Sequence, residues 1–333
     1  MVTVAILGAG FMASAHAANY AALGERVRVK WVASRTPERA AKVAATVGAE
    51  ATTDLDAAIR DADVDAVDIC LPTLLHRETA ERSLAASKHV FLEKPIALTV
   101  EDAIAIGVAA ERVGGRILMV GMVLRFWPEY VELQRRVAAG ELGRPRAVST
   151  FRLSPPADWN DWMADRSQSG GTPVDLLIHD FDQMNWLLGM PISVHAHEPV
   201  EGHVFALVEY DGASGLAEGS MRMPRSHPFS SSIRVLGDDG AAEYAFSAAP
   251  VEGEGNIGAS SSAPGLHLYP VGGEAATVPI ESADPWGPEI EAFVSGVEQG
   301  RRPEQGTAEQ ATLALGVSLA ASRSLESGRP EPV

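Results

Sequence analysis

Near its start the chain carries Val4-Ala5-Ile6-Leu7-Gly8-Ala9-Gly10-Phe11-Met12-Ala13, followed by an alanine-rich segment from Ser14 to Leu23. This order predicts a buried strand, a Gly-x-Gly-x-x-Ala turn and then a helix. Gly8 permits the tight turn, Gly10 lets a pyrophosphate approach the backbone, and Ala13 keeps the helix close to the strand. The N–H groups and positive dipole end of that helix can receive the phosphates. The motif therefore predicts binding of a nicotinamide or flavin dinucleotide.

Length, charge and cysteine content narrow the class of protein. A chain of 333 residues is long enough for about two domains, each with its own core. The net charge of −17 argues against nucleic-acid binding, which depends on clustered Lys and Arg. Cys70 is the single cysteine, so we expect no disulfide, a reducing compartment and a small core residue at this position. No apolar run has the length of a membrane span, and we therefore predict a cytoplasmic protein without membrane contact.

Strands and helices alternate as far as about residue 121. Apolar runs predict strands at 27–33, 64–71, 89–92 and 117–121, and helices are expected at 37–47, 74–86 and 100–113. Near-continuous apolar strands separated by helices are typical of a parallel sheet that is covered on both faces. We therefore predict an α/β fold whose residues 1–122 form a Rossmann domain with a doubly wound parallel sheet.

The pattern changes after residue 122. A helix is expected at 128–139, and the alternating runs at 146–153, 203–210, 216–223 and 231–236 predict strands without helices between them. Residues 245–265 have the composition of a long loop, and two helices are expected at 288–299 and 307–326. Residues 123–333 are thus predicted to form an α+β domain with a large, mostly antiparallel sheet.

The end of the second predicted strand bears on the choice of cofactor. In a Rossmann domain an acid at this point binds both hydroxyls of the adenosine ribose, but Ala33-Ser34-Arg35-Thr36 contains none. Ser34 and Arg35 instead offer a hydroxyl and a guanidinium, which suit a 2′-phosphate, and Arg39 could add a second cation. We therefore predict NADP. The alternative is that Arg35 stacks on the adenine of NAD.

Two further segments carry groups suited to proton transfer. Lys94 follows the predicted strand at 89–92, at the edge of a parallel sheet where ligands bind, and Pro95 stiffens the turn after it. We expect the Lys94–Pro95 bond to be cis. In the second domain, a helix is expected from Gly170 to Leu188, and Asp175 and His179 are four positions apart in it. This spacing places both side chains on one helical face, where acid and imidazole can orient each other. No third ligand motif accompanies them, so we predict no metal.

The motifs in this order resemble the glucose–fructose oxidoreductase and inositol dehydrogenase family (Gfo/Idh/MocA) over essentially the whole chain. The matching stretches are 8–13, 72–76, Glu93-Lys94-Pro95, Gly170-Gly171 with Asp175 and His179, 286–293 and 324–328. The resemblance implies that Lys94, Asp175 and His179 form the catalytic group. It also implies a homodimer or homotetramer built through the sheets of the second domain. Two departures are Leu71-Pro72-Thr73, where the family often has Thr-Pro-Asn, and the missing acid at Ser34.

The complete set of candidate residues follows from these motifs. The residues expected to bind the cofactor are Gly8, Gly10, Phe11, Met12, Ser34, Arg35, Arg39, Leu71, Pro72, Thr73, His76, Glu93 and Lys94. Candidate substrate contacts are Lys94, Arg125, Arg152, Trp159, Asn160, Trp162, Asp175, His179 and Asp182. The two tryptophans could stack on a sugar face, or they could serve only to pack their own segment.

The resemblance implies hydride transfer between nicotinamide and a secondary alcohol of a sugar or cyclitol. His179 would take the hydroxyl proton, Asp175 would hold its tautomer, and Lys94 would stabilise negative charge on the oxygen. Whether Lys94 or His179 accepts the proton stays open. Two alternatives are an NAD-dependent glycosidase that works by transient oxidation, and a non-catalytic regulator that senses the nucleotide.

Overall fold

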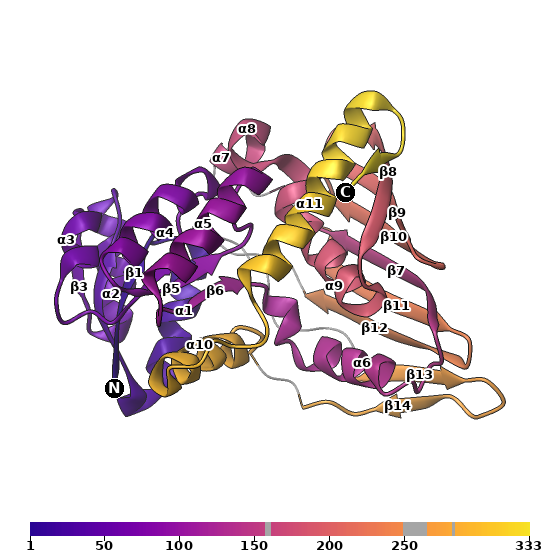
Figure 1. Ribbon diagram of the computed structural model, residues 1–333, viewed down its shortest axis with the longest axis horizontal. Coiled ribbons are helices and arrows are strands. Elements are labelled where there is room, and N and C mark those ends of the chain that lie inside the picture. Colours follow the sequence, from indigo (N-terminus) through magenta and orange to yellow (C-terminus); the bar gives the residue numbers. More distant parts are fainter. Residues whose placement is uncertain (157–160, 249–264, 282–283) are drawn as a thin grey trace. The chain divides into compact units, whose positions relative to one another are not determined.

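The computed structural model describes residues 1–156, 161–248, 265–281 and 284–333. The chain forms two compact units (Figure 1). Unit 1 comprises Met1–Phe126 and Asp284–Thr312, and unit 2 comprises Trp127–Ala283 and Leu313–Val333.

Unit 1 is built on a six-stranded sheet in the order β3-β2-β1-β4-β5-β6. Every neighbouring pair in it is parallel, as expected for a Rossmann sheet. The strands are β1 (Val2–Leu7), β2 (Val27–Ala33), β3 (Glu50–Thr52), β4 (Ala66–Ile69), β5 (His89–Glu93) and β6 (Leu118–Gly121). The α-helices are α1 (Phe11–Ala22), α2 (Pro37–Val47), α3 (Leu55–Arg60), α4 (His76–Ala85), α5 (Val100–Val113) and α10 (Gly287–Gln299).

The helices of unit 1 form two groups, which explains why its central strands are apolar. Helix α1 packs against α2 and α10, whereas α4 packs against α3 and α5. All six residues of β1 and all four of β4 are buried. A strand that is buried on both faces reads as a continuous apolar run, and this is the signal that identified the sheet from the sequence.

Unit 2 contains a nine-stranded sheet in the order β14-β13-β12-β11-β7-β10-β9-β8-β15. Its pairs are antiparallel except for β7 with β10, which is parallel. The strands are β7 (Pro145–Leu153), β8 (Pro191–Val200), β9 (His203–Tyr210), β10 (Ala213–Ser220), β11 (Phe229–Gly237), β12 (Gly240–Ala248), β13 (Leu266–Pro270), β14 (Ala276–Val278) and β15 (Glu331–Pro332). The fold class predicted from the sequence is therefore confirmed.

The helices of unit 2 cover the sheet. They are α6 (Pro128–Ala138), α7 (Asp161–Ala164), α8 (Arg166–Ser169) and α9 (Ile178–Leu188), and α11 (Ala308–Ser327) crosses from unit 1 into unit 2. Helix α9 contacts β7 and β10, and α6 contacts β12, β13 and α9. Figure 1 shows α6, α9 and the later turns of α11 against the sheet of unit 2.

The structure differs from the predicted domain boundaries in one respect. Residues 284–312 belong to unit 1, although the sequence analysis placed everything after residue 122 in the second domain. The physical reason is the apolar face of α10, where Phe293 is fully buried and packs edge-on against Phe91 of β5 with ring centroids 5.4 Å apart. A later segment thus returns to complete the first core.

Two smaller expectations also change. The strand expected at 64–71 covers only Ala66–Ile69, because the chain turns before Cys70. The loop expected at 245–265 begins later, since residues 245–248 pair with β11; residues 249–264 lie outside the described part. Among the described residues, no helix is both long and apolar enough to cross a membrane.

Candidate functional site

The turn between β1 and α1 uses its two glycines for different reasons. Gly8 has φ of +120°, and a Cβ built on it would lie 2.3 Å from the carbonyl oxygen of Cys70. Both the backbone conformation and the packing therefore require glycine at position 8. Gly10 has φ of −93°, which any residue can adopt. Apart from its chain neighbours and the adjoining helix backbone, no described heavy atom lies within 4 Å of a Cβ built on Gly10.

The open space beside Gly10 fits a bound phosphate group. Gly10 is the N-cap of α1 and offers no capping side chain, and the first turn of α1 contains no acidic residue. The first N–H groups of a helix need acceptors, and an anion supplies them while interacting favourably with the helix dipole. Phe11 and Met12, both half-buried, belong to this turn, and Phe11 packs edge-on against Trp286 with ring centroids 5.6 Å apart. The residues present therefore suit a dinucleotide.

The end of β2 presents the predicted cations to solvent. Strand β2 ends at Ala33, and the N–H of Ser34 donates to the carbonyl oxygen of Thr52 at 3.0 Å. The hydroxyl of Ser34 accepts from the N–H of Thr36 at 3.3 Å, just before α2 begins at Pro37. Arg35 and Arg39 are exposed on this turn and on the first turn of α2.

The turn after β4 is tied to the turn after β5 by His76. Its Nδ1 lies 2.8 Å from the carbonyl oxygen of Pro95, and its Nε2 lies 2.8 Å from that of Leu71. Burial lowers the pKa of His76, whereas the two carbonyl oxygens favour its protonated form. His76 is only 1% exposed and both ring nitrogens have partners within unit 1. It therefore holds two loops together, and we withdraw it as a direct cofactor contact. Leu71 and Pro72 stay half-buried on this turn, and Thr73 is buried.

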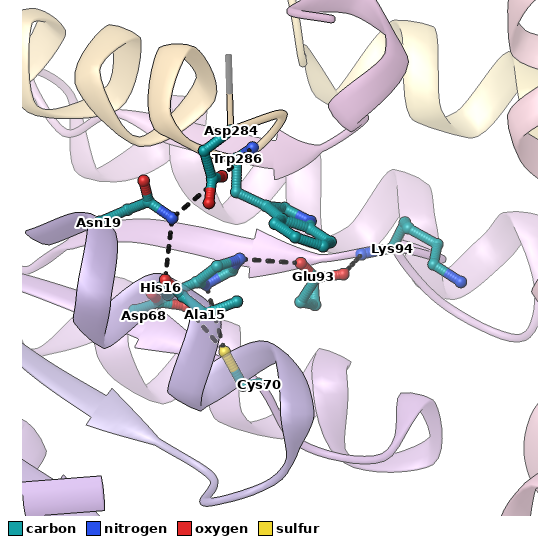
Figure 2. A network of polar contacts seen from close by, with 9 residues as sticks. All are labelled: Ala15, His16, Asn19, Asp68, Cys70, Glu93, Lys94, Asp284 and Trp286. Atoms are coloured by element: carbon teal, nitrogen blue, oxygen red, sulfur yellow. Dashed lines mark hydrogen bonds and ion pairs between the residues drawn. The ribbon is translucent and has the colours of Figure 1, made fainter. Parts of the chain in front are cut away.

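The end of β5 places Lys94 as the motif suggested. The Lys94–Pro95 peptide bond is cis, which confirms the prediction. The backbone N–H of Lys94 donates to Glu93 Oε2 at 3.0 Å. The Lys94 side chain is half-buried and extends away from the Glu93 carboxylate (Figure 2). Glu93, which was predicted to contact the cofactor, is 7% exposed and directs its carboxylate into unit 1.

Behind this turn lies a buried polar cluster that the sequence analysis missed. His16 of α1 is fully buried, and its Nδ1 lies 2.9 Å from Asp68 Oδ2 of β4 while its Nε2 lies 3.2 Å from Glu93 Oε1 (Figure 2). Cys70 Sγ lies 3.3 Å from Asp68 Oδ1 and 3.4 Å from His16 Nδ1, so Cys70 belongs to this cluster instead of being a plain core residue. Burial lowers the pKa of His16, but Asp68 raises it, and the net pKa is well above 6.5.

Glu289 of α10 also faces this cluster. It is 0% exposed, and neither of its carboxyl oxygens has a hydrogen-bond partner among the described residues. Burial raises the pKa of Glu289 well above its usual value, and the neighbouring Glu93 raises it further. Burial beside another carboxyl group therefore disfavours the ionised form of Glu289.

In unit 2 the segment that carries Asp175 and His179 is not one continuous α-helix. Thr172–Leu176 form a π-helical turn, in which the N–H of Leu177 donates to the carbonyl oxygen of Thr172 at 2.9 Å, and α9 begins at Ile178. Asp175 is 7% exposed in this turn, and His179 is half-buried in the first turn of α9. The four-residue spacing of Asp175 and His179 therefore spans the junction of a π-helical turn and an α-helix, and their sharing of one face stays a prediction. A π-helical turn is frequent at functional sites.

Several expected substrate contacts are structural. Arg152 and Asp180 form a buried ion pair between β7 and α9, with Nε 2.8 Å from Oδ2. Arg125, also buried, donates to Gln305 Oε1 at 2.7 Å within unit 1. Asp182 is buried in α9. A guanidinium taken out of water needs partners of its own, so Arg125 and Arg152 are withdrawn as substrate contacts, whereas Asp182 stays a candidate. Trp162 is half-buried on α7, whereas Trp159 and Asn160 lie outside the described residues.

Comparison with known proteins identifies the family to which this chain belongs. A family model described as an oxidoreductase family with an NAD-binding Rossmann fold (GFO_IDH_MocA) matches residues 2–122. The model of the GFO/IDH/MocA C-terminal domain matches residues 130–243. The chain belongs to the Gfo/Idh/MocA oxidoreductase family. The resemblance inferred from the motifs is confirmed, and the protein is an oxidoreductase with a nicotinamide-dinucleotide-binding Rossmann domain.

Three similar proteins illustrate this membership of the Gfo/Idh/MocA family. The chain is 32% identical over 259 residues to scyllo-inositol 2-dehydrogenase (NAD(+)) of Bacillus subtilis (strain 168), covering 72% of each chain. It is 30% identical over 310 residues to inositol 2-dehydrogenase of Rhizobium meliloti (strain 1021), covering 90% of this chain and 89% of that one. A crystal structure of GenD2 from gentamicin A biosynthesis in complex with NAD has a TM-score of 0.82 at 25% identity, covering 100% of this chain and 96% of that one.

We predict that substitution of Gly8 lowers the stability of the protein, whereas substitution of Gly10 weakens dinucleotide binding. Gly8→Ala should lower the free energy of unfolding by about 1–3 kcal/mol or more, because its Cβ meets the Cys70 carbonyl in a strained backbone region. Gly10→Val should leave thermal stability nearly unchanged and weaken dinucleotide binding at least about 10-fold. Calorimetric melting and fluorescence titration measure both quantities. Unchanged affinity in the Gly10 variant would remove this turn from the cofactor site.

The raised pKa of Glu289 predicts that the stability of the folded protein depends on pH. Because its pKa is raised in the folded state, its contribution is fully present below the unfolded pKa of about 4.5 and is lost as the pH rises toward the folded pKa. Within that range each pH unit should cost up to about 1.4 kcal/mol. Glu289→Gln should therefore flatten the decline of Tm between about pH 5 and pH 8. Glu291→Gln, on the same helix but with a side chain 56% exposed, is the control and should keep the original slope.

Proposed function

We propose that the protein catalyses reversible hydride transfer between a nicotinamide dinucleotide and a secondary alcohol of a cyclitol or sugar, in the manner of an inositol dehydrogenase. The observation that carries the proposal is Lys94, held at the carboxyl end of β5 in the unit that contains the dinucleotide turn. Ligands of parallel sheets bind at this edge. Two relatives named as inositol dehydrogenases support the substrate class. The predicted cytoplasmic location stays a prediction.

The proposed mechanism assigns one task to each of three side chains. The bound nicotinamide supplies the carbon that exchanges the hydride. His179 accepts the proton of the substrate hydroxyl, and Asp175 orients the imidazole and stabilises its protonated form. The Lys94 ammonium donates a hydrogen bond to the same oxygen and stabilises the negative charge that develops on it. The low exposure of Asp175 supports its role, because a carboxylate shielded from water interacts more strongly with a neighbouring imidazolium.

Substitution of these residues tests the assignment. Lys94→Ala and His179→Ala should each lower kcat roughly 10²–10⁴-fold and leave dinucleotide affinity nearly unchanged, because each removes a group that acts on the reacting oxygen. Asp175→Asn should lower kcat by a smaller factor, since the imidazole loses its orientation and charge partner. The assay follows the absorbance of the reduced nicotinamide with a panel of cyclitols and sugars.

The controls for this test come from the same elements. Arg77→Gln, an exposed change in α4, should retain normal turnover. Near-normal turnover in Lys94→Ala would overturn the proposed function of this residue, and near-normal turnover in His179→Ala would remove the imidazole from the mechanism.

We propose NADP as the preferred cofactor. Support comes from the end of β2, where Ser34 is followed by exposed Arg35 and Arg39 lies on the first turn of α2. A guanidinium can bind a 2′-phosphate through two parallel hydrogen bonds, and no carboxylate stands between residues 33 and 36 to bind the ribose hydroxyls. The Bacillus subtilis relative is named as an NAD(+) enzyme, so this preference would distinguish the present chain from it.

Ser34→Asp should reverse the cofactor preference. The new carboxylate would repel the 2′-phosphate and accept hydrogen bonds from the ribose hydroxyls of NAD. We expect the ratio of the Kd values for NAD and NADP to change by at least about 10-fold, equivalent to about 1.4 kcal/mol. Ala18→Asp, at an exposed position beyond the first turn of α1, is the matched charge control. A clear preference of the unmodified protein for NAD would contradict the assignment.

We also propose that the protein is a homodimer or homotetramer. Support comes from the sheet of unit 2, where alternate side chains point away from the helices. Leu207 of β9 and Leu216 of β10 are cross-strand partners and are 43% and 47% exposed, and Phe205 lies exposed two residues before Leu207 on β9. Exposed apolar side chains grouped on a sheet face favour contact with a second copy.

A further inference from the structure

The buried cluster of unit 1 joins the dinucleotide turn to the turn that carries Lys94. His16 lies on α1, less than two turns after Gly10, and Glu93 is the last residue of β5. The imidazole of His16 lies between the carboxylates of Asp68 and Glu93, at 2.9 and 3.2 Å (Figure 2). His16 Nδ1 is hydrogen-bonded to Asp68, and Nε2 faces Glu93 Oε1 at ion-pair distance without a hydrogen bond, so a positive charge on the ring interacts favourably with both carboxylates. This geometry favours an imidazolium that links α1, β4 and β5.

Glu93 passes this link on to the backbone of Lys94. Its Oε1 faces His16, and its Oε2 accepts the N–H of Lys94 at 3.0 Å. Gly121 on β6 leaves room for the carboxylate, because a Cβ at that position would lie 3.1 Å from Glu93 Oε1. The carboxylate is thus held from two sides and can adopt few other orientations. The Lys94 backbone is fixed at the point where the side chain leaves the strand.

The other charged and titratable groups of the cluster place a further demand on His16. Asp68 and Cys70 face the imidazole from β4 and its end, Glu93 faces it from β5, Glu289 from α10 and Tyr20 from α1 itself. Three of these groups are carboxyls, and His16 is the cation at their centre. Without it, buried carboxylates would repel one another, and the position of Glu93 would no longer be determined by an opposite charge.

We propose that His16 and Glu93 are positioning residues for Lys94. Asp68 holds the His16 imidazolium, the imidazolium holds the Glu93 carboxylate, and that carboxylate holds the backbone N–H of Lys94 so that the ammonium points toward the substrate oxygen. The inference rests on the proposed catalytic role of Lys94. Because His16 belongs to the helix whose first turn receives the phosphates, the same chain of contacts sets the distance between cofactor and lysine.

The same side chains offer a second chemistry that the experiment must separate. His16, Asp68 and Cys70 have ligand atoms within 4.8 Å of one another, which is also compatible with a metal ion. The 2.9 Å contact between Nδ1 and Oδ2 is a hydrogen-bond distance, and the second ring nitrogen faces a fourth group, Glu93. Nδ1 is therefore engaged in a hydrogen bond to Asp68, whereas Nε2 makes no hydrogen bond and faces the Glu93 carboxylate only at ion-pair distance. We favour positioning over metal binding.

The test compares His16→Gln, Glu93→Gln and the double variant in the full-length protein. Each single change should lower kcat about 10- to 100-fold, since a misplacement of about 1 Å can cost roughly 10²-fold, while the dinucleotide Kd changes less than about 2-fold. The double variant should be no slower than the slower single variant, because both changes break one chain of contacts. Two independent structural defects would instead multiply their effects.

One control variant makes the outcome decisive. His89→Gln alters another buried histidine, at the opposite end of β5, where its Nδ1 accepts the N–H of Ile117 at 3.1 Å. It should lower Tm without a comparable loss of kcat. Multiplicative effects in the double variant, or loss of activity only in proportion to lost dinucleotide binding, would overturn the inference. Stoichiometric metal in the purified protein, lost in His16→Gln, would also overturn it.

If Lys94→Ala is inactive and His16→Gln is normal, only this inference fails. If Lys94→Ala itself turns over normally, the proposed function of Lys94 fails as well. Should His16→Gln fold poorly, Glu93→Gln alone still tests the proposal, because it keeps the shape of the side chain while it removes the charge that faces His16.

Discussion

The close approach of Gly8 to the carbonyl oxygen of Cys70 is the constraint on which unit 1 depends. Because no side chain separates Gly8 from this carbonyl group, the end of β1 packs directly against the end of β4. Helix α1 can then begin at Phe11, close to the edge of the sheet. The turns after β1, β4 and β5 consequently lie on adjacent strands at the same carboxyl edge. Backbone packing thereby brings the turn between β1 and α1, the Leu71 turn and Lys94 to the same edge of the sheet.

Polar contacts of two buried histidines then hold these turns in place. His76 joins the Leu71 turn to the Pro95 turn, and His16 joins α1 to Glu93. Both histidines are buried, but His76 has a carbonyl oxygen at each ring nitrogen, whereas His16 has one hydrogen bond to Asp68 and an ion-pair contact with Glu93. Carbonyl oxygens carry only partial charge and leave burial to lower the pKa of His76, whereas the Asp68 carboxylate raises the pKa of His16. Similar geometry thus gives one histidine that links loops and another that compensates buried negative charge.

The fold of unit 1 could be predicted from the sequence because its signals are local. A continuous apolar run marks a strand buried on both faces, and glycines mark the turn. The return of α10 could not be predicted, because its contact with β5 joins segments about 200 residues apart. The π-helical turn at Thr172–Leu176 was equally hidden, since a sequence with α-helical spacing does not reveal an inserted residue.

The candidate site was predictable where a motif names the residue, as at Lys94 and Gly10. It was not predictable where a side chain serves another buried group. Arg152 was expected to contact the substrate because its guanidinium can donate hydrogen bonds to hydroxyl groups. In the structure it forms an ion pair with Asp180 inside unit 2. The sequence did contain one sign of the buried cluster, because Asp68 interrupts the apolar strand Ala66–Ile69. A carboxylate in such a strand requires a buried partner, which is His16.

The strongly acidic chain faces a specific problem if it is to bind an anionic dinucleotide. Its net charge of −17 repels a phosphate at long range, so attraction must come from groups close to the ligand. The N–H groups of α1 supply it for the pyrophosphate, and Arg35 and Arg39 are suited to supply it at the ribose end. Three acids of the same unit, Asp68, Glu93 and Glu289, are kept from adding to the repulsion in a different way. They are gathered behind the site, where His16 compensates the charge of Asp68 and Glu93, and burial disfavours the ionised form of Glu289. Burial of negative charge around one imidazolium and exposure of arginines at the sheet edge are therefore two parts of one electrostatic arrangement.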